Sequence, residues 1–525
     1  MKNKLLPVEW LLPAWLLVTV AVFVAALLTG GSFGWGYLCL FVLICIGLRP
    51  RSLLHTFSSE QMNLYKRLFA LLVAALTISA CILPMDDLPL WNGEIPEHRN
   101  QYELMADNLL EGRLDFAYGD EDALKALKNP YDPAERKATG VRYHWDHAYY
   151  DGHYYMYFGI VPVLLLFLPY RAVTGMALTT CHATQIFTAA AILGIFLLFH
   201  LLTRLFFKKL PFSVYLALSV AFSVMSVWYA AAEPALYCTA ITAAIALEVW
   251  SLYFFVRAVW GEQRENRQIL FAGIGALLGA LVFGCRPTIA LANILVIPML
   301  AVFLSQRKCT WKLAGKLALA ALPYAAVAAG LMLYNYARFD NPFEFGQKYQ
   351  LTVADQSQYS VALNAETRLR IWNETMENFF AIGQMKETFP YLDVYSVFYN
   401  FPVLLLGIAC LKSGVLKRMY QAKLLPLMAG LLVTVLVITA MDIVWTPYLL
   451  ERYRMDIYFL MGIGCFLTVG VWYSCCTEKQ QAYLNFALCA LSVLTVISAF
   501  LLCVDTVGVY YPEEVMNIAQ MLRLK

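Results

Sequence analysis

The sequence predicts an all-α polytopic membrane protein, a bundle of about thirteen transmembrane helices with two long polar loops. Of its 525 residues 61% are hydrophobic and the mean hydropathy is +0.61, far above the values of soluble globular chains. Apolar runs long enough to cross a bilayer recur along the whole chain. The predicted spans are 11–28, 34–48, 68–84, 184–206, 212–230, 237–256, 268–285, 287–304, 313–334, 395–411, 424–445, 456–473 and 482–503.

Two apolar segments need separate treatment. The run 11–28 has no cleavage-site pattern and further spans follow it at once, so we expect it to be retained rather than removed as a signal peptide. The run Tyr157–Leu168 is short and contains Pro162. If it were a full span, the sides of all later loops would be reversed. We therefore expect a half-helix or a surface-lying helix that returns to the face it came from.

Basic residues gather in alternate short loops, which sets the predicted orientation. These residues are Lys2, Lys4, Arg49, Arg51, Lys66, Arg67, Lys208, Lys209, Arg257, Arg264, Arg267, Arg307, Lys308, Lys312, Lys412, Lys417, Arg418 and Lys423. The positive-inside rule makes that side cytoplasmic, together with the N-terminus. The loop from Asp86 to Tyr155 and the loop from about 335 to 394 are then extracytoplasmic.

The first long loop holds fifteen of the 36 acidic residues and four of the seven histidines. Asp86 and Asp87 follow a span directly. A helix capped by Asn100 and ended by Gly112 is expected next, and its apolar face predicts a position in the membrane interface. A proline-punctuated turn at 129–133 and a dense aromatic and acidic stretch at 144–155 complete the loop.

The stretch 144–155 permits three interpretations. His144, Asp146, His147, Asp151 and His153 are possible metal ligands, but their spacing matches no standard site, so a divalent metal is not favoured and no other cofactor is expected. Tyrosines between carboxylates suit sugar binding at a membrane surface. An ordinary aromatic surface turn is the third interpretation. Neither long loop contains a cysteine, so the thirteen cysteines form no disulfide framework there.

Charged residues also lie at the predicted membrane boundary, always toward the outer face. They are Glu233, Arg286, Arg338, Asp442 and the charged residues of 451–456, which include Arg452 and Arg454. A charge at bilayer depth costs about 2.5–3.5 kcal/mol on insertion scales, which favours a functional role. Each could instead be a snorkelling residue or one half of a structural ion pair. As a set, arginines beside carboxylates predict a phosphate site next to a general base.

Several stretches resemble one known group of enzymes. They are 101–114 (QYELMADNLLEGRL), 129–133 (NPYDP), 149–159 (YYDGHYYMYFG), 286–288 (RPT), 334–339 (YNYARF) and 451–456 (ERYRMD). In this order, over about residues 68–460, they resemble the GT-C superfamily of polyprenyl-phosphate-sugar-dependent glycosyltransferases, which includes protein O-mannosyltransferases and lipid A aminoarabinose transferases. The nearest likeness is to uncharacterised bacterial members.

The resemblance implies inverting transfer of a sugar from a polyprenyl-phosphate donor to an extracytoplasmic cell-envelope glycan, lipid or protein. The donor and membrane lipid are the implied partners, and the bacterial inner membrane is the implied location. The implied catalytic carboxylate is Asp86 or Asp87, with Glu97 as a substitute where many relatives carry an Asp-Glu pair. The implied substrate-binding residues are Tyr102, Asp146, His147, Tyr150, Asp151 and Glu233, and the phosphate-binding residues are Arg286, Arg338, Arg452 and Arg454.

The predicted organisation has four parts. Residues 1–67 form a two-span extension with a cytoplasmic loop, and 68–345 form the GT-C-like catalytic module with the outer loop 85–156. Residues 346–394 are the second outer loop, and 395–525 are the C-terminal helices and tail. Two other functions stay open: a transporter or flippase of a lipid-linked or polar substrate, and an inactive relative that binds a lipid-linked sugar. The absence of an internal repeat disfavours the transporter. Nothing in the charge distribution predicts nucleic-acid binding.

Overall fold

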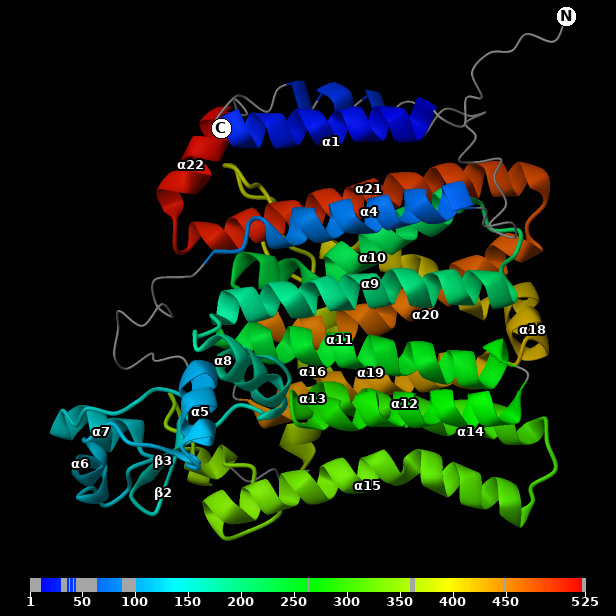
Figure 1. The fold of residues 1–525 in the computed structure, drawn as a ribbon. Coiled ribbons are helices and arrows are strands. Elements are labelled where there is room, and N and C mark those ends of the chain that lie inside the picture. Colours follow the sequence, from blue (N-terminus) through cyan, green and yellow to red (C-terminus); the bar gives the residue numbers. More distant parts are fainter. Residues whose placement is uncertain are drawn as a thin grey trace, which may run out of the picture.

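The computed structural model describes residues 11–29, 35–36, 38–40, 42–43, 64–86, 101–262, 264–358, 364–446 and 449–521. Within these ranges the chain is a bundle of long helices lying side by side, with a small mixed α/β layer at one end (Figure 1). The long helices are α1 (Leu11–Thr29), α4 (Leu64–Ile82), α9 (Thr180–Phe206), α10 (Phe212–Ala232), α11 (Leu236–Val256), α12 (Glu265–Phe283), α15 (Trp311–Phe339), α19 (Leu425–Trp445), α20 (Met455–Cys475) and α21 (Glu478–Gly508).

Nine helices in the described ranges are long and apolar enough to cross a membrane. One of them, 287–305, is composite: α13 (Pro287–Ala290), the 3-10 helix η5 (Leu291–Leu295) and α14 (Val296–Ser305). Another, 236–261, ends in the π-helix η4 (Arg257–Gly261). The structure thus supports a multi-pass helical membrane protein, while the predicted count of thirteen is not confirmed. The predicted span 34–48 lies largely outside the described residues.

The predicted span 395–411 has an unexpected form. It consists of α17 (Val397–Asn400) and the 3-10 helix η8 (Pro402–Leu411), which packs against α20. A 3-10 helix rises about 2.0 Å per residue, so ten residues cover roughly 20 Å, where an α-helix would cover roughly 15 Å. This extension lets a short segment connect the outer loop to α18 (Ser413–Gln421) at the opposite end of the bundle (Figure 1).

The sides of the loops agree with the predicted alternation. The basic turns after α9, η4, α14 and η8 lie at the end of the bundle that carries α18, and the α/β layer lies at the other end (Figure 1). Which of the two ends faces the cytoplasm remains a prediction from the positive-inside rule. We refer below to the end with the α/β layer as the outer end.

The all-α prediction is wrong for the first long loop. It contains a three-stranded antiparallel sheet in the order β1-β3-β2, with β1 (Asp115–Phe116), β2 (His147–Tyr150) and β3 (His153–Met156). Helices α5 (Gln101–Leu110), α6 (Glu121–Lys125) and α7 (Pro133–Thr139) surround it. Asp151 and Gly152 join β2 to β3 with φ angles of 48° and 83°. An Asp-Gly pair between tyrosine-rich runs is a strong hairpin signal that was missed in the sequence.

The helix predicted after Asn100 is present, but its apolar face packs against other parts of the chain. Tyr102 is fully buried, and its ring stacks on Phe167 with centroids 5.3 Å apart. Phe167 ends the π-helix η3 (Val163–Phe167), which continues into α8 (Leu168–Thr174). The segment predicted as a half-helix is thus a short helix that packs on α5. Gly112 adopts φ 74° just beyond α5, as its predicted helix-ending role requires.

The two outer loops form one layer. The second loop carries the 3-10 turns η6 (Gln347–Tyr349) and η7 (Gln356–Gln358), followed by α16 (Ala365–Phe380). Leu351 N donates to His147 O at 2.9 Å, and Asp146 N donates to Leu351 O at 3.0 Å. Arg136 Nη2 reaches Thr352 O at 2.6 Å. The remaining elements are η9 (Glu451–Arg454), which opens α20, and the C-terminal α22 (Pro512–Met521).

A backbone contact fixes this layer to the bundle, and it yields a stability prediction. Val161 N donates to Gly284 O at 2.9 Å, and a Cβ on Gly159 would lie 2.2 Å from that oxygen. Gly159→Ala should therefore push the layer off the end of α12 and destabilise the protein by about 1–3 kcal/mol, as overpacking does. The measurement is the midpoint of thermal unfolding in detergent. Gly315→Ala is the control, because no heavy atom lies within 4 Å of its Cβ.

Candidate functional site

Arg452 is the centre of the candidate site. It lies in η9 at the outer end of α20, and its guanidinium carbon is 4.0 Å from the centroid of the Tyr237 ring. Tyr237 occupies the first turn of α11, so this stacking joins two spans at their outer ends. No carboxylate oxygen of the described residues lies within the 4.0 Å of an ion pair with Arg452. A guanidinium that stacks on an aromatic ring keeps its N–H groups available for a ligand.

Asp146 faces the same place from the first outer loop. Its side chain is buried, and it accepts hydrogen bonds from the Tyr237 hydroxyl and from Gln350 Nε2, the latter at 2.7 Å. Burial raises the pKa of Asp146 above its usual value, although Tyr237 and the positive charge of Arg452 act in the opposite direction. Its φ of 54° is uncommon outside glycine, and pairing with the second outer loop holds it there.

Arg286 forms a second cationic group close by. It precedes α13, and its Nε donates to both carboxylate oxygens of Asp456 at 2.8 and 2.6 Å. Thr288 Oγ1 donates to the same carboxylate at 2.6 Å. The guanidinium carbon lies 5.0 Å from the Tyr453 ring centroid, and that of Arg452 lies 5.6 Å from the same centroid. The Tyr453 ring therefore lies next to both arginines.

Two further carboxylates belong to this neighbourhood. Glu233, at the C-terminal end of α10, accepts hydrogen bonds from Tyr229 at 2.5 Å and from Tyr510 at 3.2 Å, and its charge acts on Arg452. Asp442, near the end of α19, is buried and interacts electrostatically with Arg286 and Asp456. The spans α10, α11, α13, α19 and α20 thus all contribute charged or tyrosine side chains at their outer ends.

The other two predicted arginines have structural contacts. Arg338 Nη1 donates to Met156 O at 2.6 Å and Nη2 to Asn335 Oδ1 at 2.8 Å, which joins the end of α15 to the sheet. Arg454 Nε donates to Asn378 Oδ1 at 2.8 Å, and Nη2 donates to Tyr395 O at 2.6 Å. Both guanidinium groups hold loop segments through neutral partners, so we do not include them in the phosphate site proposed below.

The predicted sugar-binding residues separate into two groups. Asp146 and Glu233 lie near Arg452. Tyr102 is a core residue beneath the sheet, and Asp151 is an exposed residue of the β2–β3 turn. The fifth residue, Tyr150, packs against Tyr349 of the second outer loop with ring centroids 4.7 Å apart. A core position explains Tyr102, a turn position explains Asp151 and a ring contact between the two outer loops explains Tyr150, all without a substrate.

His147 is also a core residue of the loop layer. It is fully buried, its Nδ1 donates to Trp145 O at 2.9 Å, and Nε2 accepts from the Tyr118 hydroxyl at 2.8 Å. Burial lowers its pKa from 6.5 to about 3, so the imidazole is neutral at physiological pH. A neutral histidine with both nitrogens engaged within the protein has no position left for a sugar.

The lowered pKa of His147 predicts a loss of stability in acid. Between 6.5 and about 3 the unfolded chain binds a proton that the folded chain does not. Above pH 6.5 the titration of His147 does not change the free energy of unfolding. Below pH 6.5 it lowers the free energy of unfolding by about 1.4 kcal/mol for each pH unit by which the pH falls. We expect His147→Gln, measured by thermal unfolding from pH 7 to pH 4, to flatten that slope. An unchanged slope would show that other groups control acid unfolding.

Of the three predicted catalytic carboxylates, only Asp86 lies within the described residues. Asp86 is exposed just beyond the end of α4, whereas Asp87 and Glu97 lie outside the described residues. Of the predicted metal ligands, His144 pairs with Asp120 at 3.1 Å and His153 with Asp115 at 3.3 Å. In the described part of the chain, no three His, Cys, Asp or Glu side chains come together as a metal site would require.

Some residues of the site were missed in the sequence. Tyr237, Tyr453 and Gln350 contact Asp146 or the arginines, and the Tyr157 hydroxyl is close enough to Asp146 and Arg286 to interact with their charges. Tyrosines at the outer ends of spans also occur as ordinary interfacial anchors, so the pattern alone does not distinguish them. No sequence pattern marks Gln350 as a site residue, because only the pairing of the two loops brings it to Asp146.

Comparison with known proteins gives limited information. No family model matches the chain, and no curated protein matches it. Among solved structures, it is similar to the oligosaccharyltransferase AglB from Archaeoglobus fulgidus in complex with an inhibitory peptide and a dolichol-phosphate, with a TM-score of 0.41 and 12% identity. It is also similar to the oligosaccharyltransferase of the same organism tethered to an acceptor peptide with an NVT sequon, with a TM-score of 0.44 and 14% identity.

Both alignments cover 85% of this chain but only 56% and 55% of the archaeal chains. The chain therefore spans little more than half the length of those proteins. At these TM-scores and identities the likeness assigns no reaction, donor or acceptor to this chain. Its function has to be inferred from its own site.

Proposed function

We propose that this chain is a membrane glycosyltransferase that moves a sugar from a polyprenyl-phosphate donor to an acceptor at the outer face. The observation that carries the proposal is that Arg452 and Asp146 both contact Tyr237, whose ring stacks on the guanidinium and whose hydroxyl donates to the carboxylate. An arginine without an ion-pair partner in the described residues lies beside a buried carboxylate at the outer end of the bundle. A lipid-linked donor fits a site at the rim of many spans, because its apolar chain can remain in the bilayer.

Arg452 would bind the phosphate of the donor. A guanidinium offers a planar set of donors that suits phosphate oxygens, and an incoming anion would replace water rather than an existing carboxylate. Arg286 is already paired with Asp456, so it would contribute its charge without releasing that pair. As the sugar–phosphate bond breaks, negative charge grows on the departing lipid phosphate, and the two arginines would stabilise it.

Asp146 would be the general base. In an inverting transfer, the acceptor oxygen or nitrogen forms a bond to the anomeric carbon, the bond from that carbon to the phosphate oxygen breaks, and the acceptor proton passes to the base. A carboxylate whose pKa is raised by burial accepts a proton more readily than an exposed one. Asp86, Asp87 and Glu97 remain the alternative bases implied by the resemblance to GT-C enzymes. Glu233, whose charge also acts on Arg452, would contact the sugar.

One observation favours a second function, a flippase or transporter. Glu248 is buried near the middle of α11, and one of its carboxylate oxygens has no hydrogen-bond partner among the described residues. An ionisable group at that depth is a functional candidate in a transporter. The other charged groups described above lie at the outer end, which supports the transferase.

The test uses the purified full chain in proteoliposomes with a panel of polyprenyl-phosphate sugars and water or polar acceptors. The proposal expects release of free polyprenyl phosphate with inversion at the anomeric carbon, for at least one sugar. Movement of intact donor between leaflets without cleavage would replace it with the flippase. Donor binding with neither cleavage nor movement would indicate an inactive sugar-binding relative.

A further inference from the structure

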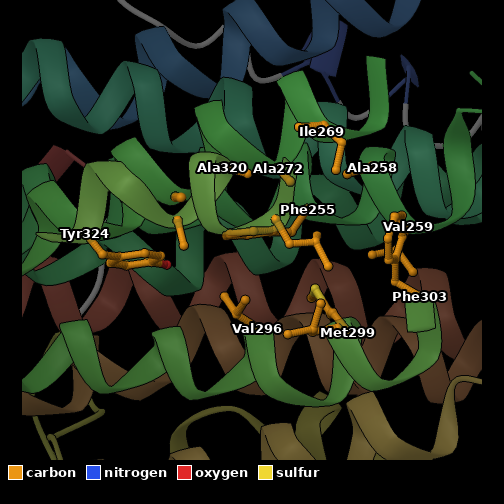
Figure 2. A pocket seen from close by; sticks show the side chains of 14 residues that line it. Phe255, Ala258, Val259, Ile269, Ala272, Val296, Met299, Phe303, Ala320 and Tyr324 are labelled. Atoms are coloured by element: carbon orange, nitrogen blue, oxygen red, sulfur yellow. The ribbon is translucent and has the colours of Figure 1, made fainter. Parts of the chain in front are cut away.

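An apolar cavity lies within the bundle, away from the charged site. It has a volume of about 110 Å³ and lies between α11, α12, α14 and α15 (Figure 2). Its lining includes Phe255, Ala272, Met299, Phe303, Ala320 and Tyr324. Figure 2 shows Tyr324 at one end of the cavity and Phe303 and Val259 at the other. None of the lining residues carries a charge.

The apolar lining favours a hydrocarbon as the ligand of this cavity. Water in a buried cavity needs about two to four polar partners, and apolar cavities of about 150 Å³ stay dry and take up small hydrocarbons. Among the described residues that line the cavity, Tyr324 alone has a hydroxyl, and that hydroxyl already donates to Asn293 Oδ1 at 2.5 Å. Asn293 in turn donates to Gly279 O and Ala290 O, both at 3.0 Å. The polar groups at the Tyr324 end are thus already hydrogen-bonded within the protein. The cavity therefore suits a hydrocarbon chain and not a polar lipid head group.

The helices that line the cavity also carry the proposed phosphate site. Arg286 lies in the turn between α12 and α13, and the cavity lies between the other half of α12 and α14. Along α12, Ala276 and Ile269 lie roughly 15 and 25 Å from Arg286 at 1.5 Å per residue. The hydrocarbon core is about 30 Å thick, so each leaflet fills about half of it. A phospholipid chain anchored at the outer rim would end before the far part of the cavity, whereas a longer chain would enter it.

The cavity is also accessible from the bilayer. Helix α15 forms one of its walls, and only 11% of its most apolar stretch is buried, so this helix lies at the edge of the bundle (Figure 1). We propose that the cavity binds the distal part of the hydrocarbon chain of the donor lipid whose phosphate lies at Arg452 and Arg286. This inference rests on the proposed function and adds to it a site that distinguishes donors by chain length.

The test uses the full chain in liposomes with a polyprenyl phosphate that carries a photoreactive group at the far end of its chain. Labelling is expected on α12 and α14 at the cavity, and unlabelled polyprenyl phosphate should compete for it. Ala320→Phe places a ring in the cavity and should weaken labelling and long-chain donor affinity about tenfold, the effect of about two methylene groups leaving an apolar site. Ala318→Phe is the control, because Ala318 is exposed on the same helix and does not line the cavity.

The outcomes separate this inference from the proposed function. Sugar transfer with no label at the cavity, or with label that phospholipid displaces equally well, would overturn the chain site and leave the transferase standing. A donor too short to reach the cavity should be transferred equally by the wild type and Ala320→Phe. Equal losses for short and long donors would show that the ring disturbs the fold and would also overturn the inference. Absence of transfer with every donor would contradict the proposed function itself.

Discussion

Replacing Arg452 with alanine is expected to lower sugar transfer by about 10²–10³-fold, the usual loss when one donor that stabilises developing charge is removed. Arg452 stacks on Tyr237 and has no ion-pair partner among the described residues, so its removal breaks no ion pair there. The buried carboxylates of Asp146 and Glu233 lose only a nearby positive charge. The loss should appear both in kcat and in the affinity for the donor, because the phosphate is present in the ground state and gains charge in the transition state.

The measurement is initial rate against donor concentration in proteoliposomes, with the unfolding midpoint recorded for each variant. Arg452→Lys keeps the charge but loses the planar set of donors, so it should recover only part of the rate. Arg113→Ala is the matched control, since it removes one outer positive charge that pairs with exposed Glu111. Unchanged donor affinity in Arg452→Ala, with a normal unfolding midpoint, would exclude Arg452 as the phosphate ligand.

Asp146→Asn is expected to lower transfer by about 10²–10⁴-fold, the range attributed to a general base. The asparagine is close in shape and can still accept from Tyr237, so donor affinity should change far less than kcat. The base must be deprotonated, so the rate should rise with pH through the raised pKa of Asp146. Tyr237→Phe removes a hydrogen bond that lowers that pKa, and it should move the rising limb of the profile to higher pH.

The double variant Asp86→Asn with Asp87→Asn distinguishes the two base proposals. If Asp146 is the base, the double variant should retain most of its activity and its pH profile. If it loses transfer while Asp146→Asn remains active, the base lies in the segment after α4, as the resemblance to GT-C enzymes implies. The pH profile is the decisive measurement, because a purely structural role of Asp146 would not move its rising limb.

The helical bundle could be predicted from the sequence because lipid permits few backbone arrangements. A run of about twenty apolar residues must satisfy its own hydrogen bonds, so runs such as 212–230 and 456–473 reappear as α10 and α20 nearly unchanged. The basic turns likewise indicated which loops share an end of the bundle. Hydrophobic runs do not predict the structure of the polar loops, where the first loop forms a sheet and Asp151 belongs to its hairpin turn.

Which charged residues make up the site depends on tertiary contacts that no local sequence pattern predicts. The sequence alone indicated that several arginines and carboxylates lie at the outer ends of the spans, because charge is costly within the apolar runs and the basic loops set the orientation. Only the tertiary structure decided that Arg338 and Arg454 bind neutral partners and that Arg286 pairs with Asp456. It also decided that Arg452 has no such pair among the described residues. The physical reason is distance along the chain. Asp146, Tyr237 and Arg452 meet only when the outer loops and spans pack together, and a guanidinium acquires its role from those partners.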